Sequence, residues 1–120
     1  MTILIVDDNT VFLRLFRLYA EDFPELNFKY FLSAVEILDF LKNSDNENIE
    51  LIVSDIRMPI MSGIELSRIV KINYPHIPVM LITGLEIDYL TNEDLQTAIR
   101  VLSKDIGIEG IISQIIEYLK

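Results

Sequence analysis

Side chains able to do metal or phosphate chemistry lie at the ends of short apolar runs in this sequence. They are Asp7, Asp8, Asp55, Thr83 and Lys104. Carboxylates brought close together repel one another, so a cluster of three raises some of their pKa values or binds a cation. Oxygen ligands that leave room for water suit Mg²⁺. These residue types therefore indicate a Mg²⁺ site with a hydroxyl and an ammonium nearby, provided that the fold brings them together.

The apolar runs are the elements that must position these side chains. Short continuous runs of this kind are typical of strands buried on both faces, as in a parallel sheet covered by helices. In an open α/β sheet, ligands bind at the carboxyl ends of the strands. We therefore expect the polar side chains to meet at one edge of the sheet. The predicted strands are 3–6, 27–32, 51–53, 79–82 and 98–103.

The segments between the runs have the spacing of amphipathic helices. Apolar residues recur every three or four positions over 12–23, 34–41, 66–70 and 108–119. Ser33 and Ser62 each begin a Ser-x-x-Glu pattern, which predicts a capping box at a helix start. A weaker, polar helix is predicted over 91–97. Strand and helix thus alternate five times, which favours a doubly wound parallel α/β sheet with helices on both faces.

Composition limits the classes of function. The 120 residues suffice for one domain, and 19 acidic against 10 basic residues give a net charge of −9. This field opposes direct binding to nucleic acid or to an anionic membrane. The absence of cysteine excludes disulfides and thiol catalysis, and the single histidine excludes a multi-histidine metal site. The N-terminus has no signal peptide or membrane span, so we expect a cytoplasmic protein without membrane insertion.

The acidic pair Asp7-Asp8, the stretch 55–63, Thr83 and Lys104 together resemble the receiver domain of two-component response regulators. The stretch reads DIRMPIMSG. The resemblance extends over essentially the whole chain. Among receivers, the chain is similar to single-domain, chemotaxis-type regulators. The resemblance implies one receiver domain over 1–120, with a flavodoxin-like five-stranded sheet of order 2-1-3-4-5 and five flanking helices.

The resemblance also implies a role for each of these residues. Asp55 would be the phosphoacceptor. Asp8, Asp55 and the backbone carbonyl of Arg57 would bind Mg²⁺, and Asp7 would reach the metal through water. The side chains that would contact the phosphoryl oxygens are those of Thr83 and Lys104.

As a receiver, the chain would be a phosphorylation-activated switch in a two-component system or phosphorelay. The donor would be a phosphohistidine on a sensor histidine kinase or a histidine phosphotransfer protein. Output would pass by protein contact through the last helix-strand-helix face to a downstream protein or output domain, and a homodimer is left open. The chain would catalyse only its own phosphorylation and slow dephosphorylation.

Three positions depart from the family pattern. Val101, three positions before Lys104, occupies the place of an aromatic residue whose inward or outward rotation accompanies activation in receivers; with Thr83 it would form the switch. Asp105 replaces the proline after the lysine, so we expect a trans Lys104–Asp105 peptide and an ion pair between these side chains at rest. Before the last strand, Thr97-Ala98 replaces the usual Gly-Ala, which predicts a short or displaced fourth helix.

Other interpretations remain open at this stage. Asp7-Asp8-Asn9 could simply cap the first helix. A degenerate receiver would act as an interaction or dimerisation module without phosphorylation. A Mg²⁺-dependent phosphohydrolase with an aspartyl nucleophile and a flavin-binding domain of the same topology are weaker alternatives. Within the receiver interpretation, Arg57 and Leu85 are expected to screen the phosphoryl group from water.

Overall fold

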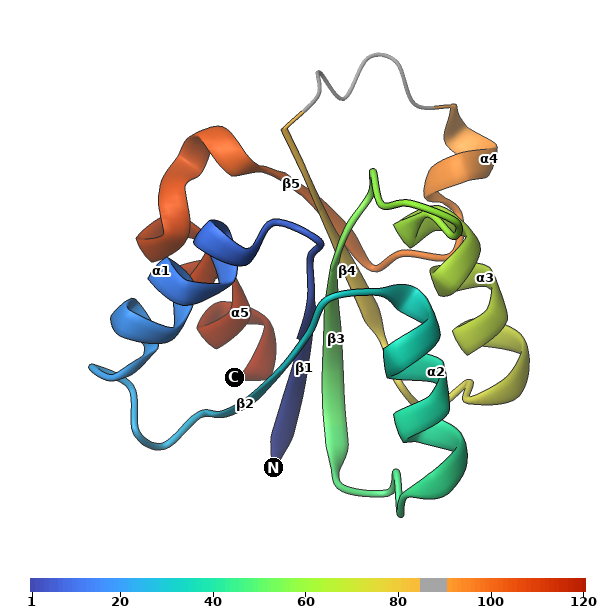
Figure 1. The fold of residues 1–120 in the computed structure, drawn as a ribbon, viewed down its shortest axis with the longest axis horizontal. Coiled ribbons are helices and arrows are strands. Elements are labelled where there is room, and N and C mark those ends of the chain that lie inside the picture. The colour runs from blue at the N-terminus through green and yellow to red at the C-terminus, as the bar shows by residue number, and fades with distance from the viewer. Residues whose placement is uncertain (85–90) are drawn as a thin grey trace.

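The computed structural model describes residues 1–84 and 91–120 and contains a five-stranded sheet (Figure 1). All neighbouring strands are parallel, in the order β2-β1-β3-β4-β5. This confirms the predicted sheet and its order. The strands are β1 (Thr2–Val6), β2 (Asn27–Phe31), β3 (Ile49–Asp55), β4 (Val79–Thr83) and β5 (Arg100–Ser103).

Helices cover both faces of the sheet (Figure 1). One face carries α1 (Thr10–Ala20) and α5 (Gly107–Leu119), and the other carries α2 (Ala34–Asn43), α3 (Gly63–Asn73) and α4 (Asn92–Leu95). The fourth of the predicted helices, α4, is a single turn of four residues, in line with the expectation of a short fourth helix. The reason is that its segment has no apolar stripe, and so short a helix gains little from packing. In the described ranges, no helix has the length and apolar character needed to cross a membrane.

Alternate residues of the strands point into two separate cores. In β1, Ile3 and Ile5 join the core beneath α1 and α5, whereas Leu4 and Val6 join the core beneath α2 and α3. All four side chains are fully buried. Burial on both faces explains why the strands appear in the sequence as continuous apolar runs rather than as an alternation. Because all neighbouring strands are parallel, their carboxyl ends, which the polar residues follow, lie along one edge of the sheet.

The two predicted capping boxes differ in the structure. At α3, the Ser62 side chain accepts from the amide of Glu65, and the Glu65 carboxylate accepts from the amide of Ser62, so the box is complete. At α2, Ser33 accepts from the amide of Glu36 as predicted. The Glu36 carboxylate, however, accepts from the amide of Leu32 and the hydroxyl of Ser33. Both helices therefore begin where the serines place them.

Gly63 is required by a close approach between the start of α3 and the end of β3. Its amide donates to the carbonyl of Ile56 at 2.9 Å. A Cβ atom at this position would lie 2.1 Å from the backbone oxygen of Asp55, which is far inside van der Waals contact. Only glycine lets the helix begin here without displacing Asp55. The segment from Asp55 to Gly63 is thereby held against the end of its own strand.

Candidate functional site

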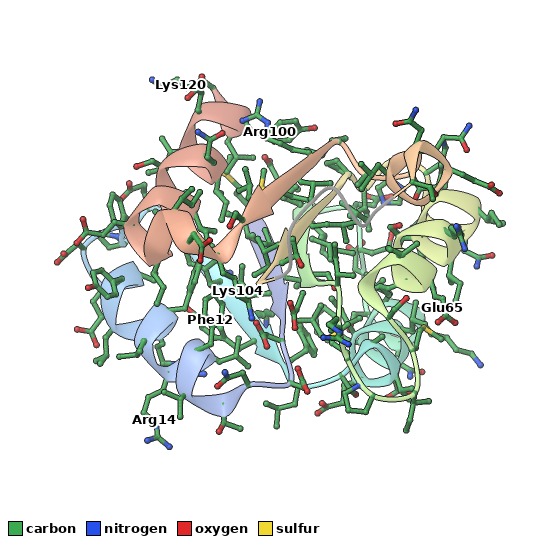
Figure 2. The ribbon with its side chains drawn as sticks, turned by 90° about the horizontal axis from the view of Figure 1, so that it is seen from above. Phe12, Arg14, Glu65, Arg100, Lys104 and Lys120 are labelled. Carbon is green, nitrogen blue, oxygen red and sulfur yellow. The ribbon has the colours of Figure 1, made fainter. Side chains whose placement is uncertain are left out.

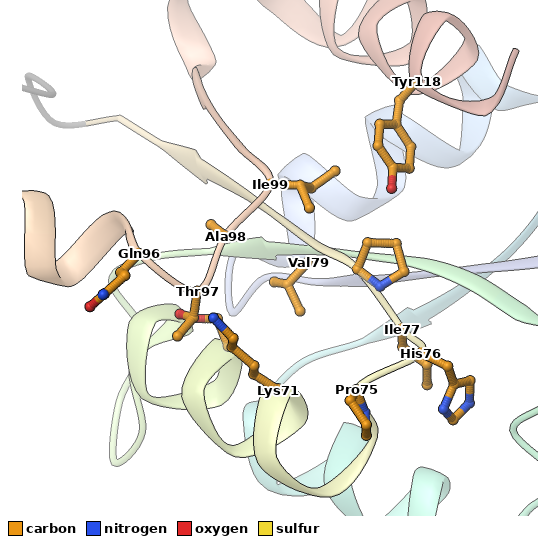
Figure 3. Close-up of a pocket in the computed structure, with 12 residues that line it drawn as sticks. Lys71, Pro75, His76, Ile77, Val79, Gln96, Thr97, Ala98, Ile99 and Tyr118 are labelled. Carbon is orange, nitrogen blue, oxygen red and sulfur yellow. The ribbon is translucent and has the colours of Figure 1, made fainter.

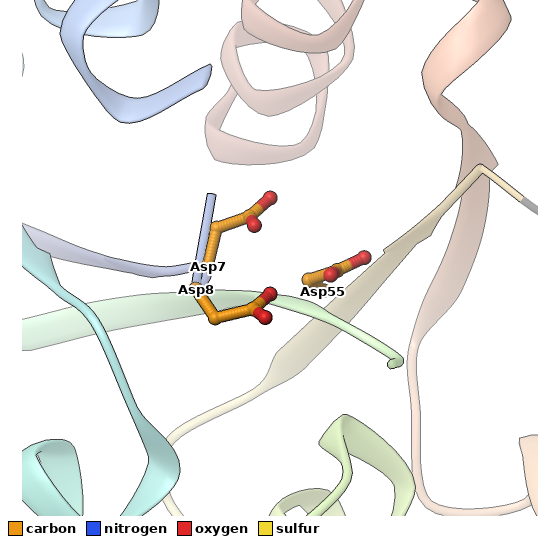
Figure 4. A group of neighbouring side chains, drawn as sticks. All are labelled: Asp7, Asp8 and Asp55. Atoms are coloured by element: carbon orange, nitrogen blue, oxygen red, sulfur yellow. The ribbon is translucent and has the colours of Figure 1, made fainter. Parts of the chain in front are cut away.

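Three carboxylates meet at the carboxyl edge of the sheet (Figure 4). Oxygens of Asp7, Asp8 and Asp55 all lie within 4.8 Å of one another. Asp7 and Asp55 are buried, and Asp8 is exposed to solvent. The structure thus brings together the three acids that the sequence analysis singled out, because β1 and β3 are adjacent parallel strands that end at the same level.

Asn9 links the acidic pair to the first turn of α1. Its backbone amide donates to Oδ1 of Asp7 at 2.9 Å, and its side-chain oxygen accepts from the amide of Phe12 at 3.1 Å. The N-cap of α1 is therefore Asn9 rather than either aspartate. Helix capping alone does not account for Asp7 and Asp8, so the capping interpretation fails for these two residues.

Lys104 contributes a positive charge next to two of these carboxylates. It is the first residue of the short 3₁₀ helix η2 (Lys104–Ile106), directly after β5. Its Nζ lies 2.8 Å from Oδ2 of Asp7 and 3.5 Å from Oδ1 of Asp55. The predicted resting pair with Asp105 is wrong, because the ammonium is engaged by these two buried acids. The exposed Asp105 instead donates its backbone amide to Ser103 Oγ at 3.1 Å.

The peptide bond after Lys104 is trans, as expected without a proline, since the described residues contain no cis peptide bond. Sequence reasoning missed one neighbour of this lysine. The ammonium also lies 4.6 Å from the centre of the Phe12 ring, and Figure 2 shows the two side chains close together. The spacing in the sequence marks Phe12 only as part of the apolar stripe of its helix. No local signal marks the contact, because it joins the first turn of α1 to the end of β5.

A small pocket opens beside Asp55. Its volume is 260 Å³, and its lining residues are Asp55, Arg57, Thr83, Gly84 and Lys104. Thr83 is buried at the end of β4, next to the strand that ends in Asp55. The side chain of Arg57 is exposed at the pocket. Leu85, its predicted companion in screening the phosphoryl group, lies outside the residues that the structure describes.

The pKa of Asp55 is raised from its ordinary value of 3.8 to about 6. Burial is the largest cause, and the negative charges of Asp7 and Asp8 add to it, while Lys104 acts in the opposite direction. For Lys104, burial by itself lowers the pKa. The paired carboxylates of Asp7 and Asp55 outweigh burial, and the net effect raises this pKa. The ammonium thus stays charged, and Asp55 holds its proton up to a higher pH than an ordinary aspartate does.

The donor set fits a divalent cation. Three carboxylates share one edge with a single ammonium, so a negative excess remains in a partly buried space. Oδ2 of Asp7 is fully buried and makes no well-aligned hydrogen bond within the described chain, and its compensating partner is the ammonium of Lys104. Hard oxygen ligands of this kind suit Mg²⁺. A cation bound here would stabilise the ionised form of Asp55.

Thr83 and Val101 lie on the same face of the sheet. Leu81 pairs with Val101 across β4 and β5, and Thr83 follows Leu81 by two residues, which returns the side chain to the same face. Val101 is partly buried and packs against the core beneath α2 and α3. A shift of Thr83 toward the pocket would therefore change the packing on the face of the sheet that carries α3 and α4.

A larger pocket of 410 Å³ lies elsewhere (Figure 3). Its lining includes Lys71, His76, Val79, Thr97 and Tyr118. Val79 begins β4 and Thr83 ends it, so this pocket lies roughly 13 Å from the carboxylate edge at the rise of a parallel strand. It therefore offers no substrate-binding space to Asp55, which weakens the phosphohydrolase alternative.

The chain is similar to known proteins over most of its length. The family model described as response regulator receiver domain matches residues 3–116. A curated relative, DNA-binding transcriptional regulator NtrC from Proteus hauseri, is 36% identical over 78 residues, which are 64% of this chain. The match spans only 16% of that relative's length.

Solved structures share the fold. The signal receiver domain of an HD domain-containing protein from Pseudomonas fluorescens Pf-5 has a TM-score of 0.84 at 22% identity, covering 98% of this chain and 93% of that one. A CheY-like receiver domain protein from Methanospirillum hungatei JF-1 has a TM-score of 0.80 at 25% identity, with coverages of 98% and 92%. The response regulator TrrA from Thermotoga maritima, solved in complex with Mg²⁺-BeF, has a TM-score of 0.76 at 20% identity, with coverages of 97% and 96%.

Proposed function

Because the chain belongs to the receiver domain family of response regulators, we propose that it is a phosphorylation-activated switch whose phosphoacceptor is Asp55. The observation that carries the proposal is the cluster of three carboxylates at the strand ends, where Lys104 pairs with Asp7 and Asp55 and lines one pocket with Asp55 and Thr83. Receivers are signalling switches rather than enzymes that turn over a free metabolite. We extend the assignment to the whole of 1–120 as one receiver domain.

In the proposed reaction, a carboxylate oxygen of Asp55 attacks the phosphorus of a phosphohistidine. The new P–O bond forms as the P–N bond breaks, and the imidazole leaves with the electron pair of that bond. The loose transition state spreads negative charge over three equatorial oxygens. Lys104, 3.5 Å from Asp55, and the hydroxyl of Thr83 at the same pocket are suited to stabilise these oxygens.

The proposed metal ligands are the carboxylates of Asp8 and Asp55 and the backbone carbonyl of Arg57, with Asp7 acting through water. Mg²⁺ bound there would supply positive charge to the attacking carboxylate and to the transferred group. This chain's own contribution is to hold Asp7 and Lys104 in fixed positions beside Asp55. The amide of Asn9 and the ammonium of Lys104 already hold Asp7 in place. TrrA, which was solved with Mg²⁺-BeF, supports the same chemistry by likeness of fold.

We propose that the signal leaves the pocket through Thr83. An acyl phosphate adds about 1.5 to 2 negative charges and three acceptor oxygens at one point. The Thr83 hydroxyl is drawn toward them, and Val101 on the neighbouring strand moves in response as the switch residue. This biases the face of α4, β5 and α5 between two arrangements. The partners are a sensor histidine kinase or phosphotransfer protein upstream and a protein or output domain downstream.

Intact mass spectrometry tests the proposal. The purified chain is incubated with Mg²⁺ and acetyl phosphate, which presents a phosphoryl group without a protein partner. We expect one added phosphoryl group on the wild-type chain and none on Asp55→Asn. A second variant, Asp39→Asn, removes an exposed carboxylate from α2 and serves as the matched control, with wild-type labelling expected.

The other outcomes identify the alternatives. A wild-type chain that takes up no phosphoryl group contradicts the proposal and favours the degenerate receiver. Rapid multiple turnover of phosphate esters favours the phosphohydrolase. Labelling that persists in Asp55→Asn shows that a different residue is the acceptor.

A further inference from the structure

We propose that Phe12 is a positioning residue for phosphoryl transfer, whose ring face fixes the ammonium of Lys104 beside Asp55. This inference rests on the proposed function. It concerns a residue of the apolar stripe of α1 that the site assignments from sequence do not include. The observation behind it is the ring of Phe12 lying against the same ammonium that pairs with two buried carboxylates (Figure 2).

Among the residues that the structure describes, three side chains lie at short range from the Lys104 ammonium. Oδ2 of Asp7 is at 2.8 Å, Oδ1 of Asp55 is at 3.5 Å, and the centre of the Phe12 ring is at 4.6 Å. The ring distance lies well within the range of a cation–π contact. The lysine side chain is about three-quarters buried. Partial burial strengthens such a contact because water competes less for the cation.

The ring is held by the same turn that holds Asp7. Asn9 donates its amide to Asp7 Oδ1 and accepts the amide of Phe12 through its side chain. One residue therefore helps to position both a carboxylate and the ring that lie next to Lys104. Phe12 also contacts Phe16, with ring centres 6.1 Å apart, which restricts its movement away from the lysine.

A ring suits this position because it attracts the cation without neutralising it. A third carboxylate would compete with the phosphoryl group for the ammonium. The face of an aromatic ring offers no competing ion pair, so Lys104 can turn from Asp7 toward the phosphoryl oxygens while it stays over the ring. Phe12 thereby restricts the ammonium before the reaction begins, so less of its orientational freedom is lost on reaching the transition state.

The test measures autophosphorylation by acetyl phosphate at saturating Mg²⁺. Phe12→Leu keeps an apolar side chain but removes the ring, and we expect its rate constant to fall roughly three- to tenfold, the range of a partly desolvated cation–π contact. Phe12→Tyr keeps the ring face and should restore the wild-type rate within about twofold. Phe28→Leu is the matched control, because its ring packs against Phe16 and Tyr30 in the same core rather than against the lysine.

A double-variant cycle separates positioning from a merely structural role. If Phe12 acts through Lys104, Phe12→Leu has no further effect in a Lys104→Met background. An equal loss in both backgrounds overturns the proposal. Phosphorylation of Phe12→Leu at the wild-type rate also overturns the role of Phe12. The proposed function would still stand in that case, because the wild-type chain is phosphorylated.

A spectroscopic measurement keeps the inference testable without phosphorylation. In the metal-free protein, the ring should shift the NMR signals of the Lys104 ε-methylene protons upfield, and Phe12→Leu should abolish that shift while Phe12→Tyr keeps it. Unshifted signals in the wild-type protein overturn the role of Phe12. By contrast, a wild-type chain that takes up no phosphoryl group while the shift is present overturns the proposed function alone.

Discussion

Lys104 forms its shortest ion pair with Asp7, at 2.8 Å, rather than with the proposed phosphoacceptor. In the unphosphorylated chain, the ammonium therefore compensates the most deeply buried carboxylate of the site. A phosphoryl group on Asp55 would compete for the same cation with three oxygens. We expect the Lys104–Asp7 pair to stabilise the unphosphorylated protein and to loosen when Asp55 is phosphorylated.

Removing the ammonium should destabilise the metal-free protein. Lys104→Met leaves the buried Asp7 carboxylate without its partner, so we expect the free energy of unfolding to fall by about 1–3 kcal/mol. Urea unfolding with and without Mg²⁺ measures the effect, and Mg²⁺ should recover part of the loss. Lys42→Met, at an exposed position of α2, serves as the control. Equal stability of Lys104→Met and wild type would show that the pair contributes nothing.

The charge of Asp55 should cost stability at neutral pH. Its pKa in the folded protein, about 6, exceeds the ordinary value of 3.8, so the folded state binds the proton more tightly. The stabilisation that results is complete below about pH 4 and is lost as the pH rises through 6. Asp55→Asn should therefore be more stable than wild type at pH 7, on the order of 1 kcal/mol, and the difference should shrink toward pH 4. Urea unfolding without metal across this range is the measurement, and a difference that grows toward low pH would contradict it.

Mg²⁺ should stabilise the folded chain, and EDTA should reverse the effect. At a hundredfold excess over its dissociation constant, a ligand of the folded state contributes about 2.7 kcal/mol. Calorimetric titration and thermal unfolding should both show weaker binding as the pH falls below about 6, because Asp55 then carries a proton. Asp8→Asn should reduce the stabilisation, whereas Asp22→Asn, at an exposed turn, should not. Equal stabilisation in Asp8→Asn would place the ion elsewhere.

Ile60 should be replaceable by glycine with a gain in stability. Its φ is 71°, a left-handed conformation that a β-branched residue adopts only at a cost, and its side chain is 95% exposed. We expect Ile60→Gly to raise the free energy of unfolding by about 1 kcal/mol. Ile72→Gly offers the opposite control, because Ile72 is also exposed but lies within α3, where glycine costs about 1 kcal/mol. Urea midpoints that move the same way for both variants would contradict this explanation.

Arg57 should prolong the phosphorylated state. Its exposed side chain lines the pocket of Asp55 and can screen the phosphoryl group from water. Arg57→Asn should then lose its phosphoryl group roughly threefold faster, which corresponds to about 0.6 kcal/mol of barrier. Decay after removal of acetyl phosphate, followed by intact mass, is the measurement. Arg14→Asn, at an exposed position of α1 outside the lining of this pocket, is the control. Unchanged decay in Arg57→Asn would refute the screening role.

The sequence by itself determined the sheet and the identity of the acidic cluster. Continuous apolar runs require strands buried on both faces, and the carboxyl ends of such parallel strands share one edge. The positions of Asp7, Asp8 and Asp55 follow from that rule, as do the helix starts at Ser33 and Ser62. These features depend on local periodicity and on the residue next to a strand end, so they are visible in the sequence.

Only the tertiary structure decided how the charges are distributed within the site. Lys104 pairs with Asp7 rather than with Asp105, and it contacts the Phe12 ring. These contacts and the raised pKa of Asp55 arise between segments that are far apart along the chain. Each depends on strand order, on the register between neighbouring strands and on how deeply the side chains are buried. Burial and distance set the strength of an electrostatic interaction, and neither is a property of a residue and its sequence neighbours alone.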